Sequence, residues 1–387
     1  MNNQEKVFQI MRKKGMDIAV LVDPANIKFI SGFEVPFWSA WMGDVSEGLP
    51  MVTAVIHAKK KSVQLISSDM YKSKIQRAGI LDASYFTSFT HLEVNDVNKN
   101  YEDVLDQVLK ESMDDHECLV VGIEENYIPQ FTVSIIKKRM PKCTFESAAQ
   151  IFKDARYIKT EQDLVGLREA ARVADAAQEK LYEIAQNEGC YTELDIWFEV
   201  QKAVSHAAGT LVPFVGELVT GPNTALSDYP LGPTVRKIEP GDCCIMDISP
   251  RVNGYWADCS NSVVFWKKPN EEQYRYFYAV KDAFNAGMEA IYPGRSFREV
   301  NEIMKKVYER HGMNFCSYQG HQIGCNVNEK PRFTYVEEAI IEKDMVLCIE
   351  PQMYTGKQGK TGIRLERMLH VTANGAVALN KFQWGIQ

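Results

Sequence analysis

One stretch of the chain, residues 241–265, limits the possible folds more than any other. Two apolar runs, GDCCIMDISPRV and YWADCSNSVVF, flank Asn253-Gly254, which is typical of a type I′ hairpin turn because both central residues of that turn need positive φ. Counting outward from the turn places Val252 opposite Tyr255. The sequence therefore predicts two antiparallel strands whose register is set by the turn.

The predicted register brings two acidic side chains together. Ser249 lies opposite Asp258, and Asp247 is two residues from Ser249, so the two aspartates are diagonal neighbours on one face, roughly 7–8 Å apart at Cα. In apolar surroundings, two like charges raise each other's pKa unless a cation lies between them. The hairpin alone leaves two interpretations open: a cation site between the aspartates, or two aspartates that flank a turn and face solvent.

Two glutamates interrupt apolar runs further along the chain. Glu350 ends the apolar segment of MVLCIEPQMY, and Glu366 stands inside GIRLERMLHV, where a core-facing strand normally carries aliphatic residues. Arg364 shares the face of Glu366 by the two-residue period of a strand, so a structural salt bridge could satisfy one of these acids. It could not readily satisfy all four acids, which leaves a cation as the general solution.

A histidine in YQGHQIG, His321, could be a nitrogen ligand or a packed core residue. Together with two aspartates and two glutamates it would form a donor set rich in oxygen. Such a set suits Mn²⁺, Co²⁺, Fe²⁺ or Zn²⁺, and the five side chains are enough for two ions.

The length and patterning of the chain predict two domains. With 387 residues, 45% of them apolar, the chain can bury a large core. Helical patterns at VFQIMRKKG and YEDVLDQVLKES alternate with strand-like runs such as MDIAVLVD, LPMVTAVIHA, KSVQLISS and ECLVVGIEE, so residues 1–153 are expected to form an α/β domain. Thr160 and Asp163 resemble a capping box that opens a long helix near the start of the second domain, residues 154–387.

Charge and composition argue against several classes of partner. The net charge of −7 is spread along the chain without a basic stripe, so no nucleic acid is expected. No apolar run approaches the roughly 20 residues needed to cross a bilayer, and the start lacks the apolar core of a signal peptide. The nine cysteines form no CxxC pair and read as reduced, buried thiols. We therefore expect a cytoplasmic protein without membrane contact.

The order of these residues resembles the pita-bread metallopeptidases, in the branch of aminopeptidase P, prolidase and creatinase. The resemblance rests on five motifs in order: Asp247, Asp258 after ten residues, His321 in GHxIG, Glu350 in IEP and Glu366 in GIRLE. It extends over the whole chain through PANIKFISGF, RYIKTEQDLVGLREAARVADAA, VTGPNTAL and NGAVALNKFQWG. The resemblance implies an α+β protein with a C-terminal pita-bread domain and a smaller N-terminal α/β domain of the creatinase/prolidase type.

The resemblance also implies roles for the five candidate ligands. Asp247 would chelate one divalent ion, His321 and Glu350 would hold the other, and Asp258 and Glu366 would bridge them. Two ions, Mn²⁺ first and Co²⁺, Zn²⁺ or Fe²⁺ as alternatives, would activate a water for attack on a carbonyl. Glu350 would shuttle the proton, and Arg364 would support the site or bind a substrate carboxylate.

Three positions depart from the pattern of this family. Where its peptidases commonly carry accessory histidines, the chain has Asp228, Ser317 and Asn328. Asn328 could still donate a neutral hydrogen bond to a substrate. Asp228 would favour a cationic substrate group, or else it caps an exposed turn. These departures leave the choice between peptide and non-peptide substrates open.

An aromatic cluster, PFWSAW at residues 36–41, is expected near a partner subunit's active site in this branch. Trp38 could help to cage a substrate, or the cluster could be buried at a subunit interface. Both interpretations favour a homodimer.

Three functions are consistent with these residues. The first is a metal-dependent hydrolase that cleaves a C–N amide bond, resembling Xaa-Pro aminopeptidase or dipeptidase. The second keeps the dinuclear site but acts as a hydrolase or lyase on a small, non-peptide substrate that carries a positive charge, as in creatinase-like enzymes. The third is a non-catalytic binding protein on a peptidase scaffold.

Overall fold

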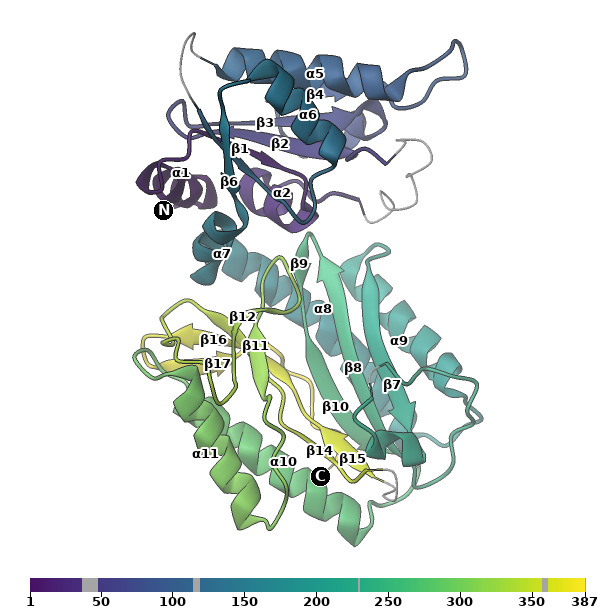
Figure 1. Ribbon diagram of the computed structural model, residues 1–387. Coiled ribbons are helices and arrows are strands. Elements are labelled where there is room, and N and C mark those ends of the chain that lie inside the picture. Colours follow the sequence, from purple (N-terminus) through teal and green to yellow (C-terminus); the bar gives the residue numbers. More distant parts are fainter. Residues whose placement is uncertain (37–47, 114–118, 229, 357–360, 387) are drawn as a thin grey trace. The chain divides into compact units, whose positions relative to one another are not determined.

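The computed structural model describes residues 1–36, 48–113, 119–228, 230–356 and 361–386 (Figure 1). The chain folds into two compact units, residues 1–160 and 161–387, and each unit is described by itself. The division that the sequence predicts, after residue 153, falls inside helix α7 (Ala149–Tyr157). We propose residues 1–153 and 154–387 as separate folding domains, which limited proteolysis would test.

The first unit is an α/β structure, as its alternating patterns predict. Its six-stranded sheet has the order β4-β3-β2-β1-β5-β6, with β1 antiparallel to β2 and parallel to β5. Its elements are α1 (Asn3–Lys13), β1 (Ile18–Leu21), α2 (Pro24–Ser31), β2 (Val52–His57), β3 (Ser62–Ser68), η2 (Asp69–Tyr71), α4 (Lys72–Arg77), β4 (Ala83–Phe86), α5 (Val97–Ser112), β5 (Val120–Ile123), α6 (Gln130–Arg139), β6 (Thr144–Ser147) and α7.

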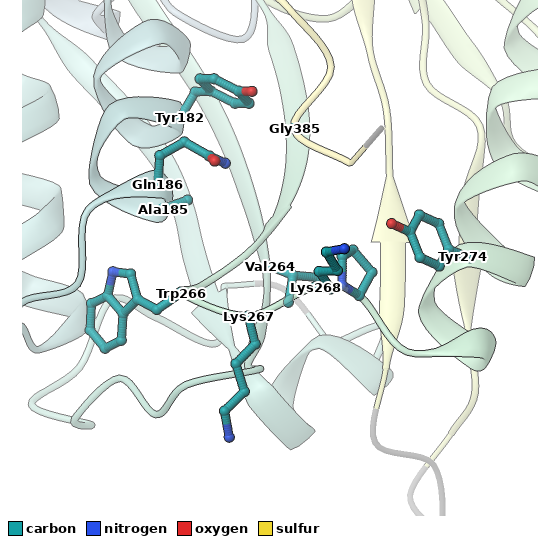
Figure 2. Close-up of a pocket in the computed structure, with 10 residues that line it drawn as sticks. Tyr182, Ala185, Gln186, Val264, Trp266, Lys267, Lys268, Tyr274 and Gly385 are labelled. Carbon is teal, nitrogen blue, oxygen red and sulfur yellow. The ribbon is translucent and has the colours of Figure 1, made fainter.

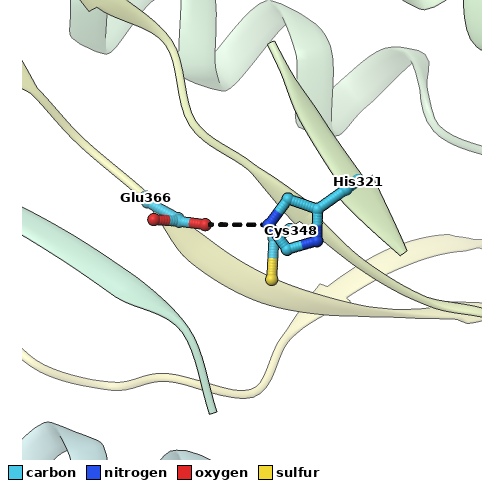
Figure 3. A group of neighbouring side chains, drawn as sticks. All are labelled: His321, Cys348 and Glu366. Atoms are coloured by element: carbon cyan, nitrogen blue, oxygen red, sulfur yellow. Dashed lines mark ion pairs between the residues drawn. The ribbon is translucent and has the colours of Figure 1, made fainter. Parts of the chain in front are cut away.

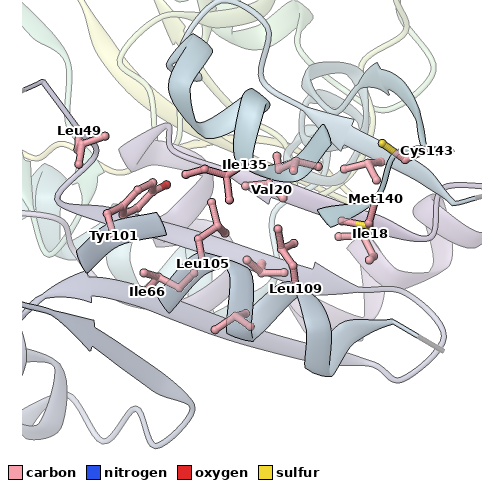
Figure 4. Packing of buried hydrophobic residues seen from close by; sticks show 14 of the residues in the cluster. Ile18, Val20, Leu49, Ile66, Tyr101, Leu105, Leu109, Ile135, Met140 and Cys143 are labelled. Carbon is pink, nitrogen blue, oxygen red and sulfur yellow. The ribbon is translucent and has the colours of Figure 1, made fainter. Parts of the chain in front are cut away.

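Helix α5 closes one core of this unit (Figure 4). Tyr101, Leu105 and Leu109 recur every four residues, which places them on one helix face, and all three side chains are fully buried in a cluster with Ile18 and Val20 of the sheet. This packing explains why a short amphipathic pattern in the sequence was enough to predict the helix.

The second unit contains the candidate ligands. Its sheets have the orders β10-β8-β7, with β9 paired to β8, then β12-β11-β13-β16-β17 and β14-β15. Its elements are α8 (Glu161–Gln186), α9 (Glu193–Ala208), β7 (Phe214–Thr220), η3 (Gly221–Ala225), β8 (Cys243–Val252), β9 (Tyr255–Trp256), β10 (Cys259–Val264), α10 (Glu271–Ala290), α11 (Phe297–Arg310), β11 (Gly320–Gln322), β12 (Glu329–Arg332), β13 (Val346–Ile349), β14 (Gln352–Tyr354), β15 (Gly362–Arg364), β16 (Arg367–Thr372) and β17 (Gly375–Ala378).

Helices of the second unit pack against its strands. Helix α8 begins directly after Thr160, where the sequence predicts it, and contacts β8 and β10. Helix α10 contacts β15 and β17, and Phe277 and Val280 join Ile363 in a buried cluster. The four candidate acids lie on the strands of this unit or directly beside a strand end.

Two groups of three neighbouring strands, β7-β8-β10 and β11-β13-β16, share one plan. The first strand of each contains a glycine at an unusual positive φ, +141° for Gly216 and +137° for Gly320. A Cβ on Gly216 would lie 2.0 Å from the Asp247 carbonyl oxygen, and one on Gly320 would lie 2.1 Å from that of Cys348. Glycine is therefore required where the first strand of each group approaches the second.

Candidate metal centre

The predicted hairpin is present in the predicted register. Its turn residues, Asn253 and Gly254, have φ of +49° and +83°, and Val252 pairs with Tyr255. The Ala257 amide donates to the Pro250 carbonyl at 2.9 Å, so the pairing continues past the short strand β9.

This register aims the two aspartates at one place. Asp247 on β8 pairs with Ser260 on β10, and Asp258 directly precedes β10, so the two are diagonal as predicted. The Ser249 hydroxyl donates to Asp258 Oδ1 at 3.0 Å and fixes that carboxylate.

The other three candidate ligands come from the second group of strands. His321 on β11 pairs with Cys348 on β13, and Glu350 directly follows β13. Glu366 directly precedes β16, and its backbone amide donates to the Ser260 carbonyl at 3.0 Å. That hydrogen bond joins the two groups of strands at the carboxylates.

The five predicted ligands converge. Carboxylate oxygens of Asp247, Asp258 and Glu366 lie within 4.8 Å of one another. The Nε2 atom of His321 lies 3.4 Å from Asp258 Oδ2, 3.7 Å from Glu350 Oε1 and 3.9 Å from Glu366 Oε1. Figure 3 shows His321 facing Glu366 with Cys348 beside them. All are buried except Asp247, which is half-buried.

The hydrogen bond of His321 prepares the ring for a metal. Its Nδ1 lies 3.0 Å from the Gln322 carbonyl oxygen, which can only accept, so Nδ1 carries the proton. When the ring is neutral, the lone pair of Nε2 faces the carboxylates, which is the tautomer that binds a metal ion.

Without a metal ion, burial and mutual repulsion disfavour the ionised forms of these carboxylates. Burial raises the pKa of Asp247 to about 7, and burial together with the neighbouring carboxylates raises the pKa of Glu350 and, strongly, that of Glu366. Burial lowers the pKa of His321, but the hydrogen bond to Asp258 and the charge of Glu350 outweigh it and raise that pKa to about 8. These acids need positive charge to remain ionised at neutral pH.

Two buried carboxylate oxygens lie where a cation could bind, because neither has a hydrogen-bond donor among the described residues. Asp247 Oδ1 and Glu366 Oε1 have no hydrogen-bond partner in the described part of the chain. Buried carboxylate oxygens without donors are costly, and divalent cations satisfy them. The four carboxylates and the imidazole therefore fit divalent metal ions.

Arg364 supplies part of the positive charge through a salt bridge. Its Nη1 lies 2.5 Å from Asp247 Oδ2 and 3.3 Å from Glu217 Oε1, and its Nη2 donates to the Tyr354 hydroxyl at 2.6 Å. The salt bridge that could satisfy one of the four acids is formed with Asp247. Strand β15 places Arg364 beside β8 and β14, so the guanidinium reaches Asp247.

Comparison with known proteins identifies the architecture. Residues 165–373, more than half of the chain, match metallopeptidase family M24, and residues 4–158 match the creatinase/prolidase N-terminal domain. The chain belongs to metallopeptidase family M24. Its α+β fold, with a pita-bread second domain and the creatinase/prolidase N-terminal domain, is the fold that the sequence predicted.

Individual M24 relatives resemble the chain along its full length. The Xaa-Pro dipeptidase of Pyrococcus furiosus is 24% identical over 383 residues, which cover 97% of both chains. A dipeptidase structure from Pyrococcus horikoshii OT3 has a TM-score of 0.79 at 20% identity and covers 99% of both chains. An X-Pro aminopeptidase structure from Thermotoga maritima MSB8 has a TM-score of 0.78 at 20% identity, covering 100% of this chain and 99% of that one.

The three positions that we expected to carry a histidine by resemblance to aminopeptidase P and prolidase lie at the surface. Asn328 is exposed, donates to the Tyr318 hydroxyl at 2.9 Å and accepts from Arg332 Nε at 2.9 Å. Ser317 is exposed. Asp228 is exposed and makes no hydrogen bond or ion pair with the described residues. Trp38 lies outside the described residues.

The sequence analysis did not identify three side chains that lie beside this candidate metal centre. Glu217 on β7 pairs with Asp247 across the sheet and is buried, Cys348 brings its Sγ within 4.8 Å of ligand atoms of His321 and Glu366, and Tyr318 stacks on His321 with ring centroids 6.5 Å apart. Two of them left a signal. Glu217 is an acid in the apolar run FVGELVT, and Cys348 shares the strand parity of Glu350.

Two polar residues of β16 are engaged elsewhere. The Arg367 guanidinium lies 3.9 Å from the ring centroid of Trp384, and His370 lies 3.1 Å from Asp344. The contact with Asp344 engages the His370 ring, and the Arg367 guanidinium has no lone pair to offer a metal ion.

A pocket of about 470 Å³ lies apart from these ligands (Figure 2). Its lining includes Tyr182, Trp266, Lys267 and Tyr274, and no predicted site residue is among the residues that line it.

Proposed function

We propose that the chain is a metal-dependent hydrolase that cleaves a C–N amide bond, with an activity resembling that of Xaa-Pro dipeptidases and aminopeptidases. The observation that supports this proposal is the convergence of four carboxylates and one metal-ready imidazole, with two buried oxygens still lacking a partner among the described residues. The names of full-length relatives, among them Xaa-Pro dipeptidases, favour the same reaction.

In this proposal, Asp247, Asp258, His321, Glu350 and Glu366 hold two divalent ions, with Mn²⁺ the preferred metal and Co²⁺, Zn²⁺ or Fe²⁺ as alternatives. Oxygen-rich donors with one imidazole support this choice. When bound, such ions supply Lewis acidity that polarises a carbonyl and makes water more acidic.

The chain's own groups orient the reactants. His321 is fixed by the Gln322 carbonyl, and Arg364 holds Asp247 in place. Glu350 is the group we propose to move a proton between the attacking water and the leaving nitrogen. Asn328, with its amide at the surface beside the centre, is proposed to bind the substrate, and so is Trp38.

A second candidate keeps the centre but changes the substrate to a small cationic molecule. It is favoured by the surface carboxylate of Asp228, which has no ion pair with the described residues. Glu217, a fifth carboxylate next to Asp247, belongs to the charge balance of the centre itself. With Arg364 as the paired guanidinium, five carboxylates leave four surplus negative charges, which two divalent ions would neutralise. Any further negative charge at the centre would then favour a positively charged substrate.

Substrate turnover separates the two candidates. Protein loaded with Mn²⁺ should hydrolyse dipeptides and tripeptides with proline in the second position faster than matched peptides with alanine there. No turnover of the proline peptides by protein with two bound ions per chain would exclude the peptidase. Hydrolysis of small guanidino or quaternary-ammonium amides, lost in Asp228→Asn, would then establish the second candidate.

Metal content tests whether the chain is an enzyme of this type at all. We expect about two Mn²⁺ ions per chain after loading and gel filtration, measured by elemental analysis. Less than one ion per chain would leave a non-catalytic binding protein as the function.

We also propose that the chain forms a homodimer and resides in the cytoplasm. The eight cysteines in the described part of the chain are all free thiols, which supports a reducing compartment. No helix in the described ranges is long and apolar enough to cross a membrane. Light scattering after gel filtration would test the dimer, with twice the 44.0 kDa chain mass expected.

A further inference from the structure

A cysteine lies among the proposed ligands. Cys348 on β13 pairs directly with His321 on β11, and directly opposed residues of antiparallel strands point to the same face of the sheet. Glu350 follows two residues after Cys348, so the two-residue period of a strand gives it the same face. The Cys348 side chain therefore points to the side of the sheet that carries the centre.

The sulfur lies close to two of these ligands. Ligand atoms of His321, Cys348 and Glu366 lie within 4.8 Å of one another, and all three residues are buried (Figure 3). The thiol is free rather than bonded in a disulfide. The three atoms are close enough together to bind one metal ion.

Glu366 gives independent evidence for an ion at this point. Its side chain is 1% exposed, and its Oε2 accepts from the Ser260 hydroxyl at 3.1 Å. Its Oε1 has no hydrogen-bond partner among the described residues and lies 3.9 Å from His321 Nε2. A buried carboxylate oxygen without a donor is costly. An ion beside His321 would give this oxygen its missing partner.

The candidate ligands in the described part of the chain form two groups of different chemistry. Asp247, Asp258 and Glu366 offer only oxygen, whereas His321, Cys348 and Glu366 offer nitrogen, sulfur and oxygen. Carboxylates suit hard ions such as Mn²⁺, whereas thiolate together with imidazole suits Zn²⁺. The two positions of the centre should therefore differ in the metal ion that they select.

We propose that Cys348 is a ligand of the ion held by His321, and that its sulfur makes this position selective for Zn²⁺ over Mn²⁺. The proposal rests on the proposed function, because it requires a dinuclear centre. When the ion binds, the thiol proton passes to solvent and the sulfur donates an electron pair to the metal. The all-oxygen position lacks this selectivity, so with limited Zn²⁺ the centre holds one ion of each kind.

The first test uses Co²⁺ as a spectroscopic probe of metal-free protein. A thiolate bound to Co²⁺ absorbs in the near ultraviolet through charge transfer from sulfur to the metal. Wild-type protein with two bound Co²⁺ ions should show this absorption band. Cys348→Ser keeps the size of the side chain but replaces sulfur by oxygen, so it should lack the band, and so should Cys348→Ala.

The second test compares metal affinities by competition with a chromophoric chelator. Cys348→Ser should weaken Zn²⁺ binding by at least about 10-fold, because even groups that only support a ligand change metal affinity by about 10- to 100-fold when removed. Mn²⁺ binding should weaken less than Zn²⁺ binding, because Mn²⁺ prefers oxygen ligands.

Two control variants separate ligation from the loss of a thiol elsewhere. Cys244 is fully buried on β8 and lies an odd number of residues from Asp247, so it faces away from the centre. Cys190 is an exposed thiol that could bind Co²⁺ at the surface. Both Cys244→Ser and Cys190→Ser should keep the band and the wild-type Zn²⁺ affinity. Urea denaturation of the metal-free variants identifies any that fail to fold.

Each outcome decides a different point. A wild-type protein that holds two Co²⁺ ions without the band, or an equal band in Cys348→Ser, would overturn Cys348 as a ligand and leave the proposed function intact. Equal losses of Zn²⁺ and Mn²⁺ affinity in Cys348→Ser would overturn the selectivity. A protein that shows the band with two bound ions but hydrolyses no amide would overturn the proposed function and leave the ligand in place.

Discussion

Arg364 is the buried cation that pairs with the acids of the centre when no metal is present. It contacts Asp247 and Glu217, and its own pKa is raised well above the usual range because the carboxylates and Tyr354 outweigh its burial. A buried ion pair need not stabilise a fold relative to apolar residues, but losing one partner leaves an unpaired charge. Arg364 therefore contributes to stability by providing the buried carboxylates of Asp247 and Glu217 with a cationic partner.

Arg364→Met should lower the free energy of unfolding of the metal-free protein by about 3–5 kcal/mol at pH 8, measured by urea titration. Adding Glu217→Gln should recover part of the loss, because it removes one of the two carboxylates left without a cation. Unchanged stability in the single variant would contradict the structural role of the pair.

Asp258 is the proposed ligand whose loss should affect metal binding most specifically. Its carboxylate faces both His321 and the oxygens of Asp247 and Glu366. We expect Asp258→Asn to retain fewer than two Mn²⁺ ions per chain by elemental analysis and to lose hydrolytic activity. Asp282→Asn, which removes a surface partner of His311, should retain the wild-type metal content. Two retained ions in Asp258→Asn would exclude a bridging role.

At the scale of elements, the position of His321 depends on how closely β11 approaches β13. Gly320 makes this approach possible, because any Cβ there would overlap the Cys348 carbonyl. The adjacent His321 can reach the carboxylates only while the two strands stay paired.

Gly320→Ala should therefore push β11 away from β13 and weaken Mn²⁺ binding by more than about tenfold, as judged by calorimetry. Gly312→Ala is the matched control, since Gly312 has φ of +64° but a Cβ at this position would meet no atom within 4 Å. It should lose about 1–2 kcal/mol of stability without a change in metal affinity. Equal metal affinities in the two variants would show that the close approach is dispensable.

The arrangement of the strands also explains which parts of the centre could be predicted from the sequence. The Asn253-Gly254 turn sets the register by local chemistry, so the meeting of Asp247 and Asp258 followed from counting residues. Glu350 and Glu366 were identified because they interrupt apolar runs, and His321 as a possible nitrogen ligand; the resemblance over the whole chain implied their roles. The partners of Arg364 and the stacking of Tyr318 depend on how separate strands are placed side by side, which strand periodicity cannot supply.

At the scale of the molecule, the centre couples metal binding, protonation and folding. Asp247 has a pKa of about 7 in the fold against an ordinary value of 3.8, and His321 has one of about 8 against 6.5. The metal-free fold therefore binds more protons than the unfolded chain between about pH 4 and pH 8. Its stability should fall as the pH rises through that range.

The melting temperature of the metal-free protein should decrease from pH 5 to pH 8, because Asp247 and His321 lose their protons over this range. Added Mn²⁺ should raise the melting temperature more at pH 8 than at pH 5, because the ligands bind metal only after losing their protons. In Asp247→Asn the decrease should be shallower. An identical pH dependence in that variant and the wild type would contradict the raised pKa of Asp247.

The shared plan of the two strand groups has a consequence for the ancestry of the domain. In each group the first strand carries the glycine of unusual φ, and an acid directly precedes the third strand, Asp258 before β10 and Glu366 before β16. Two helices precede each group, α8 and α9 in one case and α10 and α11 in the other. Duplication and fusion of one ancestral half would produce this arrangement, with Asp258 and Glu366 descending from the same residue.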